Sequence, residues 1–219
     1  MKTFLLSFFI LLTTIPLYGG EVKGKIQFWE RSLSGDDWIL SKSHENAVVF
    51  ITGLSEEAPK DTAIYHDQFD KTFLQRVMPI TSGQTVTFRN RDPVNHNVWS
   101  LSKAKSFDLG LFKAPVEKSV TFEKPGIVKI FCNIHPQMIA TFLVLKNNKY
   151  FLTREDGAYS ISNIPAGNYK LRVWVEGTKL TSKEIKVTES SQQTIEFPIK
   201  VIRSSQKHLN KFGKPYKKY

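Results

Sequence analysis

The chain has 219 residues, with 31 Lys and Arg against 20 Asp and Glu, and a formal net charge of +11. Its 41% apolar and 23% charged residues are ordinary globular values, which exclude a mostly disordered chain. A single cysteine cannot form an internal disulfide, so a small disulfide-built scaffold is also excluded. The length predicts one or two domains.

The first twenty residues predict a secretory signal peptide. Lys2 supplies a positive start, residues 4–12 are apolar apart from Ser7, and Gly19 and Gly20 are small residues suited to cleavage. The apolar run is too short to span a bilayer, and no later segment approaches the roughly 18 consecutive apolar residues of a membrane helix. We therefore expect a periplasmic or secreted protein with no membrane span.

From Glu21 onward the sequence predicts short strands separated by turns. Turn residues such as Asp156-Gly157 and Pro165-Ala166-Gly167 separate the apolar runs. Alternating or β-branched runs predict strands at residues 22–28, 47–51, 85–88, 119–122, 127–131, 141–145, 159–161 and 169–175. Amphipathic helical patterns with capping signals are missing from the sequence. We therefore expect an all-β protein built from β-sandwiches.

One short stretch, Phe-Cys-Asn-Ile-His-Pro-Gln-Met, combines three metal-ligand types. Cys132, His135 and Met138 lie between two predicted strands, so one tight loop can aim a thiolate, an imidazole and a thioether at one point. His96 follows another predicted strand and a turn at Pro93, and a sandwich can bring that turn beside the Cys132 loop. Taken singly, these residues could be a buried thiol, core filler and loop histidines.

Taken together, two imidazoles, a thiolate and a weak thioether are the ligand set of a type 1 copper site. Soft sulfur stabilises Cu(I), whereas imidazole binds both oxidation states of copper. Zinc is disfavoured because a thioether is a poor zinc ligand and a fourth hard donor is missing. A catalytic Cys/His nucleophile is an alternative, but it leaves Met138 and His96 unexplained.

Residues 62–146 resemble the type 1 blue-copper cupredoxins of the amicyanin and plastocyanin kind. The resemblance rests on the Cys-x2-His-Pro-x-Met loop and on the His-Asn pair upstream of it. It implies a Greek-key sandwich without catalytic residues. It also implies that Asn97 ties the two ligand loops together beside the metal. The implied copper ligands, for one copper per chain, are His96, Cys132, His135 and Met138.

Residues 147–199 resemble a second family, the carboxypeptidase regulatory-like module, which is a smaller transthyretin-like β-sandwich. The resemblance rests on DGAYSI at 156–161 and IPAGNYKLRV at 164–173. A complete module needs further strands, which residues 21–57 can supply. We therefore expect a discontinuous domain over 21–57 and 147–199, with the cupredoxin domain, 58–146, inserted into it. The alternative is a tandem arrangement in which residues 21–57 join the cupredoxin domain.

The combination of the two modules resembles bacterial proteins labelled methylamine-utilisation-like. It implies an exported mononuclear blue-copper protein, not an enzyme, that carries single electrons by Cu(II)/Cu(I) cycling. The positive charge favours an acidic redox partner, such as a c-type cytochrome or a periplasmic oxidoreductase, and export disfavours nucleic acid. Two alternatives stay open: a copper-binding or copper-delivery protein without electron transfer, and a non-redox binding or adhesion module.

Three histidines lie outside the proposed ligand set. His66 lies near the first strand of the expected cupredoxin domain and is more often a strand residue than a metal ligand. His44 and His208 lie in polar or basic stretches, and we expect them to be solvated. Residues 200–219 form a basic C-terminal tail without an acidic residue, which we expect to be mobile.

Overall fold

The computed structural model describes residues 19–35, 37–56, 62–202 and 209–216. These residues form strands, turns and loops, and none of them lies in a helix, so the predicted all-β fold class is confirmed. It follows that the described part of the chain contains no helix that could cross a membrane. Residues 1–18 of the expected signal peptide lie outside the described residues.

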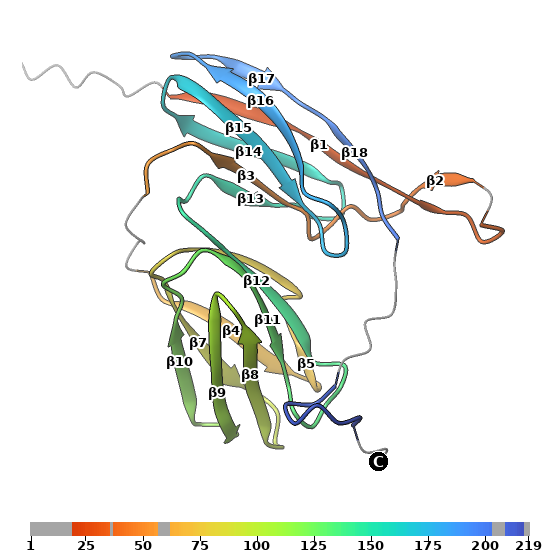
Figure 1. Ribbon diagram of the computed structural model, residues 1–219, viewed down its shortest axis with the longest axis vertical. Helices are drawn as coiled ribbons and strands as arrows, with labels where there is room; N and C mark the ends of the chain where they lie inside the picture. Colours follow the sequence, from red (N-terminus) through yellow and green to blue (C-terminus); the bar gives the residue numbers. More distant parts are fainter. Residues whose placement is uncertain (1–18, 36, 57–61, 203–208, 217–219) are drawn as a thin grey trace, which may run out of the picture.

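Two sheets form a first sandwich (Figure 1). The central strand of one sheet is β1 (Gly20–Arg31), and its partners are β2 (Trp38–Leu40), β14 (Ala158–Ile164), β17 (Gln192–Thr194) and β18 (Phe197–Lys200). The order of the other sheet is β13 (Tyr150–Leu152), β3 (Val48–Thr52), β15 (Gly167–Trp174) and β16 (Thr181–Val187). Residues far apart in the sequence therefore share one sandwich.

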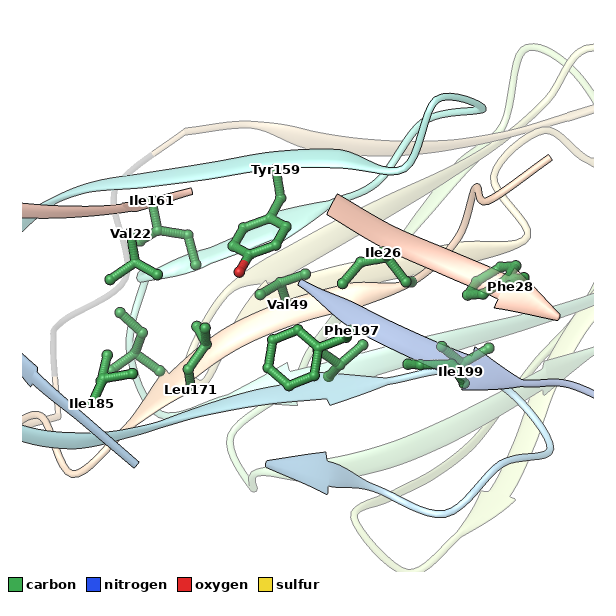
Figure 2. Close-up of a cluster of buried hydrophobic side chains, with 14 of the residues drawn as sticks. Val22, Ile26, Phe28, Val49, Tyr159, Ile161, Leu171, Ile185, Phe197 and Ile199 are labelled. Carbon is green, nitrogen blue, oxygen red and sulfur yellow. The ribbon is translucent and has the colours of Figure 1, made fainter. Parts of the chain in front are cut away.

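The core of the first sandwich follows from the alternation of its strands. In β1 the inward residues Val22, Ile26 and Phe28 are at most 3% exposed, whereas their neighbours face outward. Figure 2 shows these side chains meeting residues of the opposite sheet, such as Val49 and Leu171. The turn before β14 requires Gly157, because its φ is +70° and a Cβ there would lie 2.1 Å from the Ile26 carbonyl oxygen.

The second sandwich is built from nine consecutive strands among the described residues. The order of one sheet is β10 (Glu117–Thr121), β7 (Thr85–Asn90), β4 (Ile64–Phe69) and β5 (Thr72–Phe73). The order of the other is β6 (Val77–Thr81), β12 (Ile139–Leu145), β11 (Gly126–Phe131), β8 (His96–Ser102) and β9 (Lys105–Phe112). The pairs β4–β7 and β6–β12 are parallel, and the other pairs are antiparallel.

The two sandwiches contact each other through an apolar patch and one carboxylate. All seven residues of β12 are buried, because one face of this strand lines the second core while Leu143 and Leu145 face the first sandwich. There they pack with Val48, Phe50 and Trp174. Beside this patch the Glu176 carboxylate accepts hydrogen bonds from side chains of the second sandwich: Arg76, Lys129 and Thr141.

Candidate metal centre

The loop that carries three of the predicted ligands is closed at its base by backbone hydrogen bonds. We call residues 132–138, which connect β11 to β12, the ligand loop. The Cys132 amide donates to the Met138 carbonyl at 3.1 Å, and the Met138 amide donates to the His135 carbonyl at 3.1 Å. The antiparallel register of β11 and β12 brings Phe131 opposite Ile139, so both ends of the loop are fixed to the sheet.

Strand register places His96 beside this loop. β8 and β11 pair in antiparallel fashion at Trp99 and Phe131. Because the strands are antiparallel, the residues before Trp99 lie at the same end of the sheet as the residues after Phe131. His96, three residues before Trp99, therefore lies beside the start of the ligand loop. The fourth predicted ligand, Met138, is fully buried at the end of the loop, in the same apolar cluster as Cys132.

Three donor atoms from these two segments converge. The Nδ1 atoms of His96 and His135 are 2.9 Å apart, and the Cys132 sulfur lies 3.8 Å from the His135 Nδ1. One donor atom from each of the three residues lies within 4.8 Å of the others. Donors that share one metal ion at bond lengths of about 2.0–2.3 Å lie roughly 3–4 Å apart. The residues therefore fit a single metal ion.

The orientation of the His96 ring is set by a buried carboxylate. The Nε2 atom of His96 lies 2.6 Å from Asp92 Oδ2, and both side chains are almost completely buried. Asp92 also accepts the backbone amides of Asp70 and Lys71, at 2.8 and 2.9 Å. An ionised carboxylate accepts a proton donor on Nε2, which leaves Nδ1 as the ring nitrogen that faces His135 and the cluster.

The ionisation states of Asp92 and His135 favour the binding of a cation. Burial alone would raise the pKa of Asp92, but hydrogen bonds from the Lys71 amide and the His96 ring lower it, so Asp92 is ionised. Burial lowers the pKa of His135, and the neighbouring His96 and Lys71 lower it further. His135 is therefore a neutral ligand at pH 7, because its ordinary value is already about 6.5.

Asn97 lies at the site but contacts a different partner from the expected one. Its amide nitrogen donates to Asp108 Oδ1 at 2.7 Å and to the Gly110 carbonyl at 3.0 Å, both in β9. The hydrogen bonds of its side chain thus join β8 to β9, and the resemblance gave no indication of this. Asp108 lies in a strand and accepts these hydrogen bonds, and it is not one of the three converging donors.

The other histidines are not part of this cluster. His66 is fully buried in the second core, and one of its ring nitrogens lies 3.0 Å from the Gln75 carbonyl oxygen. The expectation that His44 is solvated is wrong, because its side chain is buried and its Nδ1 accepts the Phe28 amide at 3.0 Å. A polar sequence context did not reveal this backbone acceptor role. His208 lies outside the described residues.

Sequence reasoning missed three residues that hold the site together. Asp92 belongs to the loop before His96, and its spacing of four residues from that histidine was a usable signal. Lys211 and Tyr216 belong to the basic tail, and both contact the ligand loop. No local signal indicates these contacts, because 78 and 84 residues separate the partners.

Comparison with protein families gives a match outside the metal centre. A family described as polysaccharide lyase family 4, domain II, matches residues 140–195, which run from β12 to the connection between β17 and β18. The carboxypeptidase regulatory-like resemblance of this region is therefore not shown. A comparison with curated proteins finds no match.

Several solved structures are similar to part of the chain. A mutant of amicyanin in its Cu(I) form is 24% identical with a TM-score of 0.36, over 44% of this chain and 97% of that protein. A copper-containing nitrite reductase from Thermus scotoductus is 22% identical with a TM-score of 0.37, over 42% and 24% of the two chains. A purple cupredoxin from Nitrosopumilus maritimus is 22% identical with a TM-score of 0.33, over 37% and 98%.

Proposed function

We propose that this protein is an exported, mononuclear blue-copper protein that carries single electrons between redox partners. The observation that carries the proposal is the convergence of one thiol sulfur and two imidazole nitrogens within 4.8 Å, at one end of a β-sandwich. This is the donor set of a type 1 copper site. A copper ion held by His96, Cys132 and His135, with Met138 as the weak fourth ligand, would supply the one-electron chemistry.

The surroundings of the donors favour electron transfer over copper delivery. Cys132 and His96 are fully buried, and each is fixed by strand pairing or by a hydrogen bond to a buried group. Ligands held in this way move little when the charge of the site changes, and a small rearrangement suits fast electron exchange. His135 is half-buried, so its ring is the ligand that a partner protein can approach.

The proposed partner is an acidic redox protein, such as a c-type cytochrome or a periplasmic oxidoreductase. The net charge of +11 steers an acidic partner toward the protein and raises the rate of encounter more than the final affinity. We assign no catalytic residue, and we assign the first sandwich, with its regulatory-like sequence pattern, a supporting role.

The proposal is tested by titrating the chain without residues 1–20 with Cu(II), followed by visible absorption and electron paramagnetic resonance. We expect an intense blue band at one copper per chain, bleached by a reductant and restored by an oxidant. Cys132→Ser should abolish the band, because the thiolate is its source, whereas Met138→Gln should retain copper with an altered reduction potential.

Other outcomes would identify a different function. An unchanged blue band in Cys132→Ser would refute the ligand assignment. A colourless complex that loses copper readily and does not cycle between oxidation states would indicate copper handling. A binding activity that survives Cys132→Ala would indicate a non-redox module.

A further inference from the structure

We propose that residues 209–216 form a strap that positions the ligand loop and shields the Cys132 thiol. The effect of the strap on bound copper rests on the proposed function. Its hold on the loop is a property of the metal-free chain and can be tested separately. The strap follows β18 of the first sandwich in sequence, yet it lies beside the β11–β12 connection of the second (Figure 1).

The strap contacts the first two residues of the ligand loop directly. The Tyr216 hydroxyl donates to the Cys132 carbonyl oxygen at 2.7 Å, and the Lys211 amide donates to Asn133 Oδ1 at 3.0 Å. Burial raises the pKa of Tyr216 to about 12, and the nearby Cys132 contributes to the increase, so the hydroxyl keeps its proton at neutral pH. The Cys132 carbonyl oxygen thus accepts a hydrogen bond from a residue 84 positions away in the sequence.

A third contact connects the strap to the segment that carries His96. The Lys211 ammonium lies 2.6 Å from Asp108 Oδ2, and the other oxygen of Asp108 accepts the Asn97 amide at 2.7 Å. Asn97 directly follows His96. A continuous set of hydrogen bonds therefore runs from Asn97 through Asp108 and Lys211 to Asn133. It joins the two ligand-bearing segments that the resemblance expected Asn97 to help tie together.

The strap is itself an ordered turn. The Gly213 amide donates to the Asn210 carbonyl at 2.9 Å, and the Asn210 amide donates to the Lys214 carbonyl at 2.9 Å. The Asn210 side chain accepts the amides of Phe212 and Lys214, at 3.0 and 3.1 Å. These bonds order the turn that carries Lys211 and precedes Tyr216. Less conformational entropy is therefore lost when the strap binds the ligand loop.

Removing the strap should leave both sandwiches folded. Among the described residues, neither apolar core includes a side chain beyond Val201. The loop, in contrast, would keep only its own turn and base hydrogen bonds, and such a segment opens more often than the strands beside it. Loss of the strap should therefore open the loop while both apolar cores stay folded.

The first experiment measures the reaction of the Cys132 thiol with 5,5′-dithiobis(2-nitrobenzoate) in the metal-free chain under native conditions. Cys132 is fully buried, so the reaction reports opening of the loop. We expect a chain ending at Ile202 to react more than about tenfold faster. Tyr216→Phe, which removes one hydroxyl, should react about fivefold faster, the scale of one neutral hydrogen bond.

A charge-matched pair separates the specific contact from loss of charge. Lys211→Ala should accelerate the thiol reaction, because it breaks the ion pair with Asp108. Lys214→Ala removes the same charge from the same turn without affecting that pair, so its rate should match the parent. In all variants urea unfolding should remain cooperative, and the free energy of unfolding should fall by no more than the change in thiol rate represents, so global unfolding does not explain the faster reaction. Parent-like thiol rates in both Tyr216→Phe and Lys211→Ala would overturn the proposal, even if the truncated chain fails to fold.

The second experiment uses the copper-loaded chain. A positioning role predicts that truncation and Tyr216→Phe change the copper hyperfine splitting and accelerate copper transfer to a chelator, whereas a role in global stability alone would change neither. Faster thiol reaction in a chain that binds no copper would support the strap and refute the proposed function. Parent-like thiol rates in variants of a chain that forms the blue site would support the proposed function and refute the strap.

Discussion

Asp92 is the residue on which the orientation of His96 depends. Its two carboxylate oxygens accept three hydrogen bonds, from the His96 ring and from the amides of Asp70 and Lys71. The last two residues have φ values of 49° and 52°, so they form a tight left-handed turn between β4 and β5. One buried carboxylate thereby fixes the ring of a proposed ligand to a hairpin in the opposite sheet.

Asp92→Asn should weaken both the fold and the metal centre. The single amide oxygen cannot accept all three donors, and the charge-assisted bond to His96 is lost. We expect a loss of about 1.5–3 kcal/mol in the free energy of unfolding of the metal-free chain and a 10–100-fold weaker affinity for copper. Urea unfolding and competition with a coloured chelator measure these two quantities.

Asp70→Asn is the matched control, because it removes a carboxylate of the same charge from the turn itself, and the exposed Asp70 side chain is outside this network, which uses only the Asp70 backbone amide. It should change neither quantity appreciably. Equal stability and equal copper affinity in Asp92→Asn and the parent would show that the carboxylate does not position His96.

His66 gives the protein a predictable sensitivity to acid. Burial lowers the pKa of His66 to about 4, against the opposing effects of the Gln75 carbonyl and Asp67. The unfolded chain takes up a proton near pH 6.5, whereas the folded chain does so only near pH 4. The stability contribution of neutral His66 is therefore lost as the pH falls from about 6.5 to 4, by up to ~3 kcal/mol.

His66→Gln should remove this part of the pH dependence, because glutamine does not titrate and its amide can still donate to the Gln75 carbonyl. We expect the difference in unfolding free energy between the variant and the parent to shift in favour of the variant by ~3 kcal/mol between pH 6.5 and 4. Urea unfolding at several pH values measures it. A constant difference would mean that His66 titrates alike in both states.

At the scale of single strands, those that the sequence predicts have an apolar inward face, although β6 and β18, whose inward residues are also apolar, were not predicted. All eight predicted runs lie in or overlap strands of the structure, among them β1, β7 and β12. β4 was not predicted as a complete strand because its inward residues are His66 and Gln68, so hydrophobic alternation is missing. β16 was missed because it faces the core only through Ile185 and Val187 and is otherwise charged or polar.

The same limit applies to the metal centre. The sequence indicated Cys132, His135 and Met138 as ligands because the three lie within seven residues. It indicated His96 because a predicted strand and a turn precede it. Asp92 could have been noticed by its spacing from His96. The strap could not have been predicted. Its contacts with the ligand loop join segments 78 and 84 residues apart, whereas sequence patterns describe only local preferences.

At the scale of the whole molecule, Glu176 connects the two sandwiches. It belongs to the turn after β15, and its carboxylate accepts Arg76 Nη2 at 2.7 Å, the Thr141 hydroxyl at 2.9 Å and the Lys129 ammonium. Burial alone would raise the pKa of Glu176, but the hydrogen bond and charge of Lys129, together with Arg76, lower it. The group is therefore ionised at neutral pH and forms a charged contact beside the apolar patch.

Glu176→Gln should uncouple the sandwiches without disrupting either core. The amide keeps the shape of the side chain but leaves two cations without their counter-charge, which should cost about 1.5–3 kcal/mol at pH 7. Because the two apolar cores are separate clusters, we expect the melting transition to broaden or split in calorimetry. The difference from the parent should shrink as the pH falls below the ordinary glutamate value of about 4.3, because the unfolded parent chain takes up a proton there before the folded carboxylate does.

Glu184→Gln provides the control for this prediction. Glu184 forms an exposed pair with Lys170 inside the first sandwich, at 3.2 Å, so its loss should have little effect on the melting profile. The strap adds a second readout, because it follows the first sandwich in sequence and grips the ligand loop of the second. If Glu176 fixes the two bodies, Glu176→Gln should also accelerate the reaction of the Cys132 thiol. A parent-like melting profile with a parent-like thiol rate would show that Glu176 does not hold the sandwiches together.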